Sequence, residues 1–138
     1  MAEARKQLRE RRKELQIGFD LAIQTDPELA AVRTAICVPL RMVECWALAD
    51  REALSTVAGR QVRQQEIGAK PELLWGDEED PNSSHPKCVL ERVIGRSVGR
   101  DDFANIATAA SIDLLKQNCP LSFVPFAEDV ERHVAACK

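Results

Sequence analysis

The chain has 138 residues and a formal net charge of −3, which suits one domain with its own core and is too short for two ordinary domains. Hydrophobic residues make up 45% of the chain and charged residues 30%, a balance that excludes an intrinsically disordered protein. Aromatic residues amount to only 4%, with no tyrosine, so the core must be aliphatic and rich in alanine, which favours packed helices over a sheet.

The sequence favours a cytoplasmic location without membrane association. Apolar runs such as that from Ala35 to Leu40 are far shorter than the roughly 20 residues of a membrane span. The first residues are charged and helix-forming and lack the apolar stretch of a signal peptide. Five cysteines, an odd number without a disulfide framework, fit a reducing compartment.

Charge is unevenly distributed along the chain. Residues 1–70 carry 12 Lys/Arg against 10 Asp/Glu, a balance of +2, whereas residues 71–138 carry 7 against 12, a balance of −5. The two halves can therefore attract each other within one chain or across a dimer, or present opposite charges to a partner.

Helical spacing predicts a first helix over 2–24 and a second over 27–49. The first two turns of the first helix hold almost nothing apolar besides Leu8, so we expect this end to project into solvent or to meet another chain. Pro39 lies within the second helix, where we expect a kink because the apolar stripe keeps its phase across the proline. That stripe comprises Leu29, Val32, Ile36, Leu40, Val43 and Ala47.

Four further helices are predicted after these. Asp50 can cap a helix over 50–67, and Ser84 or His85 can cap one over 86–98 that Gly99 stops. Asp101 can cap a helix over 101–117, and a last helix covers 125–137. No segment alternates at period two for long enough to predict a strand. The expected fold is an all-α, single-domain bundle of six to seven helices with an acidic loop at 76–86.

This loop is the strongest candidate for a binding surface. Other acidic clusters open helices, where negative charge is favourable, but the four consecutive carboxylates here have no such role. A charged loop held by a rigid scaffold suits docking of a basic partner. The residues predicted to bind the partner are Trp75, Asp77, Glu78, Glu79, Asp80 and His85.

Both histidines precede a cysteine at metal-ligand spacing, as His85-x-x-Cys88 and His133-x-x-x-Cys137. Pairs three or four residues apart can face one zinc ion. However, Cys137 lies on the apolar stripe of the last helix, and His85 stands before a proline in a loop. We therefore expect no metal and no cofactor, and keep a site formed by these four residues as an outside alternative.

Two other functions, cysteine-dependent catalysis and nucleic-acid binding, have candidate residues in the sequence. A cysteine nucleophile could be drawn from Cys119 with His133 and Asp129 or Glu131, but no hydrolase signature or glycine-rich oxyanion loop accompanies Cys119. The basic N-terminal run could contact phosphates, yet glutamates are interspersed with it and no aromatic side chains are available to stack on bases. We therefore do not expect nucleic acid to be the partner. Contact with a second copy or with a protein partner is expected instead at Arg5, Arg9 and Arg12.

These patterns favour a small cytosolic helical protein that binds another protein and is not an enzyme. An adaptor, a secretion chaperone and an immunity-type inhibitor of a toxin all fit. One alternative is a homodimeric regulatory protein whose first helix pairs with its own copy. Another is a metal-binding or cysteine-dependent helical enzyme that uses the His/Cys pairs.

Overall fold

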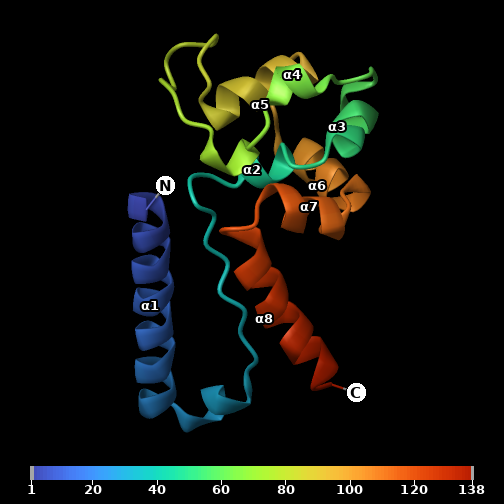
Figure 1. Cartoon of the computed structure of the whole chain (residues 1–138). Coiled ribbons are helices and arrows are strands. Elements are labelled where there is room, and N and C mark those ends of the chain that lie inside the picture. The colour runs from blue at the N-terminus through green and yellow to red at the C-terminus, as the bar shows by residue number, and fades with distance from the viewer. Residues whose placement is uncertain (1, 138) are drawn as a thin grey trace. The chain divides into compact units, whose positions relative to one another are not determined.

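A computed structural model describes residues 2–137, and over this range it is entirely helical, without a strand (Figure 1). The predicted all-α class is confirmed. The described chain divides into two compact units, each treated separately below: residues 2–40 with 121–137 form unit 1, and Arg41–Pro120 form unit 2. The expectation of a single domain stays a prediction. No helix within 2–137 is both long and apolar enough to span a membrane.

Unit 2 contains the hydrophobic core. Leu48, Leu54 and Leu90 are almost completely buried there, and partly buried side chains such as Phe103 pack against the cluster that they form. The helical elements of unit 2 are α2 (Glu44–Ala47), α3 (Arg51–Ala58), α4 (Gln64–Ile67), η2 (Pro71–Leu73), α5 (Pro86–Ile94), α6 (Arg100–Ala109) and α7 (Ile112–Asn118).

The predicted helix over 50–67 is two shorter helices, α3 and α4. Its start is as expected, because the Asp50 side chain accepts hydrogen bonds from the backbone N–H groups of Glu52 and Ala53. Its end is not, because Gly59 adopts a left-handed conformation with φ 66° and stops α3 one residue after Ala58. The prediction missed this glycine as a helix stop.

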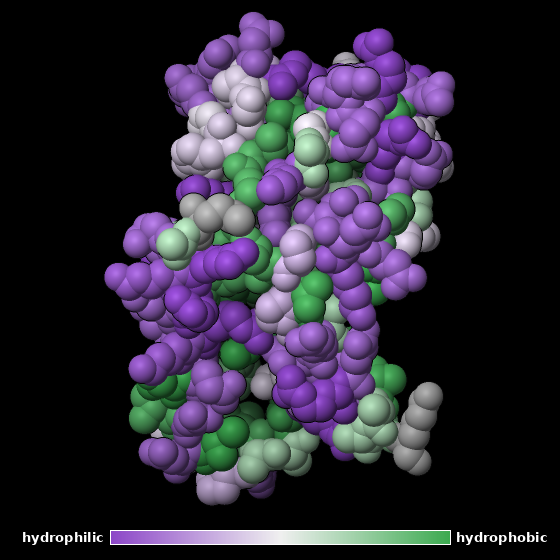
Figure 2. All heavy atoms as spheres, viewed as in Figure 1, coloured by the Kyte–Doolittle hydropathy of each residue, from purple (hydrophilic) through white to green (hydrophobic). Residues whose placement is uncertain are grey.

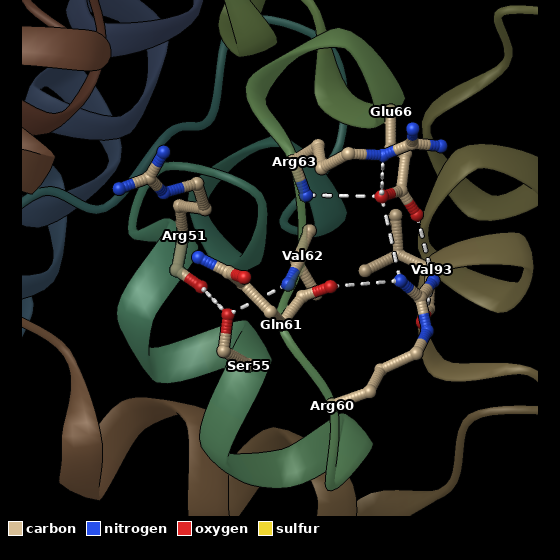
Figure 3. Close-up of polar contacts among 8 residues, drawn as sticks. All are labelled: Arg51, Ser55, Arg60, Gln61, Val62, Arg63, Glu66 and Val93. Atoms are coloured by element: carbon tan, nitrogen blue, oxygen red, sulfur yellow. Dashed lines mark hydrogen bonds and ion pairs between the residues drawn. The ribbon is translucent and has the colours of Figure 1, made fainter.

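A polar network fixes the segment between α3 and α4 (Figure 3). The Glu66 carboxylate accepts hydrogen bonds from Arg60 Nη2 at 2.7 Å and from the backbone N–H of Arg63 at 2.9 Å. Arg60 also donates to the carbonyl of Val93 near the end of α5, at 2.9 Å. The Arg60 guanidinium lowers the pKa of Glu66 to about 2. This network ties α4 to α5 from outside the core.

The predicted helices over 86–98 and 101–117 are also shorter than expected. Gly95, with φ 85°, ends α5 four residues before Gly99. Ser111 starts a separate helix, α7, by accepting a hydrogen bond on its hydroxyl from the backbone of Leu114. Asp102, not the predicted Asp101, satisfies the start of α6, because its carboxylate accepts from the Gly99 N–H at 2.9 Å.

Unit 1 differs from the prediction in the segment that follows the first helix. It consists of α1 (Ala2–Thr25), η1 (Pro27–Ala31), an extended segment that begins at Val32, and α8 (Phe123–Ala135). The helix predicted over 27–49 with a kink at Pro39 is wrong: only η1 and the four-residue α2 form within that range. Figure 1 shows the extended segment running between α1 and α8.

Long-range polar contacts hold unit 1 together. Arg12 on α1 forms an ion pair with Asp129 on α8 at 2.8 Å and donates to the carbonyl of Ile36 in the extended segment, also at 2.8 Å. The same Asp129 carboxylate accepts from the Ile36 N–H. Arg33 donates to the carbonyl of His133 near the end of α8, where a cation is favourable. Unit 1 is thus organised around charged groups.

Candidate docking loop

Residues 75–85, between η2 and α5, cover all but the last residue of the loop predicted over 76–86, because Pro86 begins α5; we call them the docking loop. Two aspartates shape it from within. Asp77 Oδ1 accepts from the backbone N–H of Glu79 at 3.0 Å, and Asp80 Oδ1 accepts from that of Asn82 at 2.9 Å. Side-chain to backbone bonds two residues apart define Asx turns. Two of the four carboxylates therefore have a structural role that the sequence analysis did not assign to them.

The two ends of the docking loop approach each other closely at Gly76. A Cβ atom on Gly76 would lie 2.7 Å from the backbone nitrogen of His85 and 2.9 Å from that of Ser84. Only glycine fits here, because any side chain would force the two backbone strands apart. The His85 N–H also donates to the Ser83 hydroxyl at 3.1 Å, which fixes the exit from the loop.

Three side chains of α5 bind the docking loop to the scaffold. Arg92 donates to the carbonyls of Pro81 and Ser83, the latter at 2.8 Å. Lys87 Nζ lies 3.3 Å from a carboxylate oxygen of Glu78, which raises the pKa of Lys87. Cys88 Sγ donates to the carbonyl of Glu78 at 3.5 Å. The loop is therefore held in one conformation by contacts to the helix that follows it.

An aromatic group lies exposed at the start of the docking loop. The Trp75 side chain is 57% exposed, and the guanidinium carbon of Arg41 lies 5.0 Å from its ring centroid, within cation–π distance. The centroid of the His85 ring lies 5.5 Å from that of the Trp75 ring. His85 is 3% exposed, and its Nδ1 has no hydrogen-bond partner within residues 2–137. His85 therefore packs against the tryptophan ring and, being buried, is not itself available on the surface.

The predicted partner contacts on α1 behave differently from one another. Arg5 and Arg9 are exposed. Arg12 is half-buried and forms the ion pair with Asp129 described above, so it stabilises unit 1. This role could not be predicted from sequence, because Arg12 lies in a run of charged residues that all resemble a solvated helix face.

The four residues of the alternative metal site are divided between the two units. His85 and Cys88 belong to unit 2, whereas His133 and Cys137 belong to unit 1. Within residues 2–137 no group of three or more His, Cys, Asp or Glu side chains is placed to hold a metal ion. His133 Nε2 contacts the carbonyl of Thr34, and Cys137 Sγ accepts from Arg33, so both are engaged by protein groups.

The alternative cysteine nucleophile is unsuited to that role. Cys119 is completely buried in unit 2, and its thiol points to the carbonyl of Cys45. Burial raises the pKa of Cys119 well above its usual range, and the pKa of Cys45 is raised to about 11 for the same reason. Because a thiolate is the reactive form, both groups behave as small hydrophobic side chains.

Residues that the sequence analysis missed are Arg41, Gly76 and Arg92, which set the loop geometry. A glycine directly after an exposed tryptophan was a usable signal for close backbone approach. Arg41 and Arg92 gave none, because their contacts are made across the fold. No protein-family model, curated protein or solved structure matches this chain. The class that the fold and the site define is an all-helical protein with a preformed acidic loop.

Proposed function

We propose that this protein acts by binding another protein, and that the docking loop recognises a basic segment of that partner. The observation that carries the proposal is an ordered loop with exposed carboxylates beside an exposed tryptophan. The carboxylates of Asp77, Glu78, Glu79 and Asp80 all lie on exposed residues.

Pre-ordering of the docking loop lowers the entropic cost of binding. A loop that already holds its bound conformation loses less freedom when a partner arrives, so more of the contact energy appears as affinity. The Asx turns and the Arg92 contacts supply this order. Exposed acidic groups steer a basic partner to the site, and a tryptophan is among the most effective anchors at interfaces.

The free cysteines bear on the cellular compartment in which the protein works. We infer a non-enzymatic, cytoplasmic protein. The cytoplasmic location is supported by the five free thiols, which are expected in a reducing compartment. An adaptor, a secretion chaperone and an immunity-type inhibitor of a toxin would each use the loop in the same way: a rigid acidic surface meets a basic one.

Affinity capture with charge variants tests the proposal. The quadruple variant D77N/E78Q/E79Q/D80N removes four charges but keeps each side-chain carbonyl, so the Asx turns can still form. Proteins captured from the source cells are identified by mass spectrometry, and the recurrent ones are purified and their binding is measured. We expect about tenfold weaker binding at low salt, and a smaller difference as salt increases.

A matched control removes the same number of exposed charges elsewhere. The variant E52Q/D113N/E128Q/E131Q changes four exposed acidic residues outside the docking loop. Its binding should equal that of the unmodified chain, and Trp75→Ala should weaken binding in parallel with the quadruple loop variant. Equal binding by the loop variant and the unmodified chain would overturn the proposal.

A further inference from the structure

The C-terminal half of α1 exposes an unusual amount of hydrophobic surface. Within residues 15–25 the single charged side chain is Asp20. Three large apolar residues here are about half exposed: Leu15 at 46%, Ile17 at 49% and Leu21 at 56%. Ile17 and Leu21 lie one helical turn apart, and exposed apolar side chains grouped in this way mark an interaction site on soluble proteins.

No core within unit 1 accounts for these residues. The hydrophobic core cluster of the described chain lies entirely in unit 2, and Ala4 and Leu8 are the buried residues of α1. In Figure 2, hydrophobic residues gather at the lower left of the view. Figure 1, seen from the same side, places the C-terminal end of α1 and η1 there. Nearby Leu29 and Val32 extend the surface, with 38% and 57% exposure.

Gly18 lies in the middle of this surface. Ile17 and Leu21 are one turn apart on one stripe of α1, Leu15 and Phe19 are one turn apart on another, and Gly18 separates the two stripes. No described atom lies within 4 Å of the position that a Cβ on Gly18 would take. A glycine within a helix costs about 1 kcal/mol relative to alanine, and here it leaves the backbone open to close approach by another helix.

Charge changes sign along residues 2–31, which comprise α1 and η1, between a basic half at 2–13 and an acidic half at 14–31. Residues 2–13 carry six Lys/Arg and two Glu, a balance of +4, whereas residues 14–31 carry four Asp/Glu and no Lys/Arg, a balance of −4. Two such helices side by side repel if they run parallel and attract if they run antiparallel. A second copy of the chain therefore has the charge pattern that this surface requires.

We propose that α1 pairs antiparallel with α1 of a second copy, crossing near Gly18, so that the protein is a two-fold symmetric dimer. The basic half (2–13) of each copy then faces the acidic half (14–31) of the other, which continues from α1 into η1, and the exposed apolar residues are covered at the centre of the contact. A two-fold interface uses the same patch on both subunits, which a single self-complementary helix provides.

Sedimentation equilibrium of the full chain tests this directly. The unmodified chain should show a concentration-dependent mass that approaches twice 15.4 kDa. Leu21→Glu should raise the dimer dissociation constant about 100-fold or more, because the symmetry introduces the change twice and each buried leucine is worth about tenfold or more. A monomeric mass for the unmodified chain at all concentrations would overturn the proposal.

Ile112→Glu is the matched control, because Ile112 is 55% exposed and lies in unit 2. Its dimerisation should be unchanged, which excludes a general effect of adding a surface charge. Circular dichroism checks that both variants keep their helix content. Persistence of the dimer in Leu21→Glu, with helix content intact, would show that α1 is not the interface.

A charge-mixing experiment tests the antiparallel orientation. Arg9→Glu with Lys13→Glu brings the basic half to zero net charge, and Asp20→Lys with Glu28→Lys does the same for the acidic half; all four residues are exposed. Each double variant alone should dimerise more weakly. An equimolar mixture should recover association, because one oppositely charged pair of halves is restored. No recovery in the mixture would contradict the antiparallel arrangement.

Discussion

Asp50 is a buried carboxylate that satisfies the starts of two helices at once, so its removal should be costly. The side chain is 3% exposed. Its Oδ1 accepts from the backbone N–H groups of Glu52 at 2.9 Å and Ala53 at 3.1 Å, which caps α3. Its Oδ2 accepts from the N–H of Ser111 at 2.8 Å, at the start of α7 and 61 residues away. Asp50→Ala leaves all three donors without this acceptor.

The magnitude follows from these bonds. Loss of an N-cap costs about 1 kcal/mol, and loss of a hydrogen bond to a charged acceptor costs about 1.5–3 kcal/mol. Asp50→Ala should therefore lower the free energy of unfolding by about 3 kcal/mol. Asp50→Asn can keep the α3 cap through its carbonyl oxygen but turns an NH₂ group toward Ser111, so we expect about half of that loss to remain.

Urea unfolding followed by circular dichroism measures both values. Asp113→Ala is the control, since Asp113 is an exposed acidic residue in the first turn of α7 and its removal should cost less than about 0.5 kcal/mol. If Asp50→Ala is as stable as this control, the bond between Asp50 and Ser111 does not contribute to the folded state, and the reasoning is refuted.

Three further results are expected. Gly76→Ala should destabilise the protein by about 1–3 kcal/mol in thermal unfolding, because the new methyl group would lie 2.7 Å from the His85 nitrogen; an unchanged melting temperature would contradict the close approach. Glu66→Gln should lower the melting temperature by a constant amount above pH 4.5, and the difference from the unmodified chain should vanish as pH falls toward 2. The reason is that the pKa of Glu66 is lower in the folded state than in the unfolded state, so the Glu66 carboxylate contributes its full stability above the unfolded-state pKa and loses it when it is protonated in the folded protein. A difference independent of pH would refute this. A thiol reagent on the folded chain should modify the exposed Cys37 and Cys137 first and leave Cys45 and Cys119 unmodified until denaturant is added. Mass spectrometry of the intact protein counts the adducts, and modification of Cys45 or Cys119 without denaturant would contradict their burial.

The helix predicted over 27–49 shows where periodicity alone misleads. Its apolar residues fit a helical stripe, but the β-branched residues Val32, Thr34, Ile36 and Val38 also alternate along the chain. None of the three residues between them has a β-branched side chain. β-branched side chains favour extended backbone, and Pro39 restricts the residue before it to the same region. Ile36 is buried while Cys37 is exposed, as an extended segment requires.

Helix starts were predicted better than helix ends. Asp50 caps α3 as expected because an N-cap bond is local, between residues two or three apart in sequence. Gly59 and Gly95 end helices early, and neither was recognised, since a glycine within an apolar pattern can be either a tolerated interior residue or a left-handed C-cap. The backbone angle that distinguishes the two is not visible in composition.

The candidate site was located from sequence, but its rigidity was not. A break in helical periodicity with four carboxylates and a tryptophan identified the docking loop, because those signals are local. The contacts that order it are not local in pattern: Arg92 lies eleven residues from Pro81 on the following helix. The same is true of Arg12 and Asp129, which are 117 residues apart and each resemble ordinary surface charges. Such pairings depend on how the chain folds back on itself, so no regular residue spacing in the sequence indicates them.

The two units use their hydrophobic residues differently, and this makes the two proposals independent. Unit 2 encloses a core in which Leu54 is fully buried, so it can hold the docking loop rigid without help from a partner. Unit 1 is held by charged groups and leaves apolar side chains of α1 in solvent, where each Å² of such surface costs about 25 cal/mol until something covers it. Leu21→Glu keeps every carboxylate of the docking loop, and the quadruple loop variant keeps every residue of α1. Each variant is therefore the control for the other experiment: loss of the dimer with partner binding retained, or the reverse, assigns each surface to its own role.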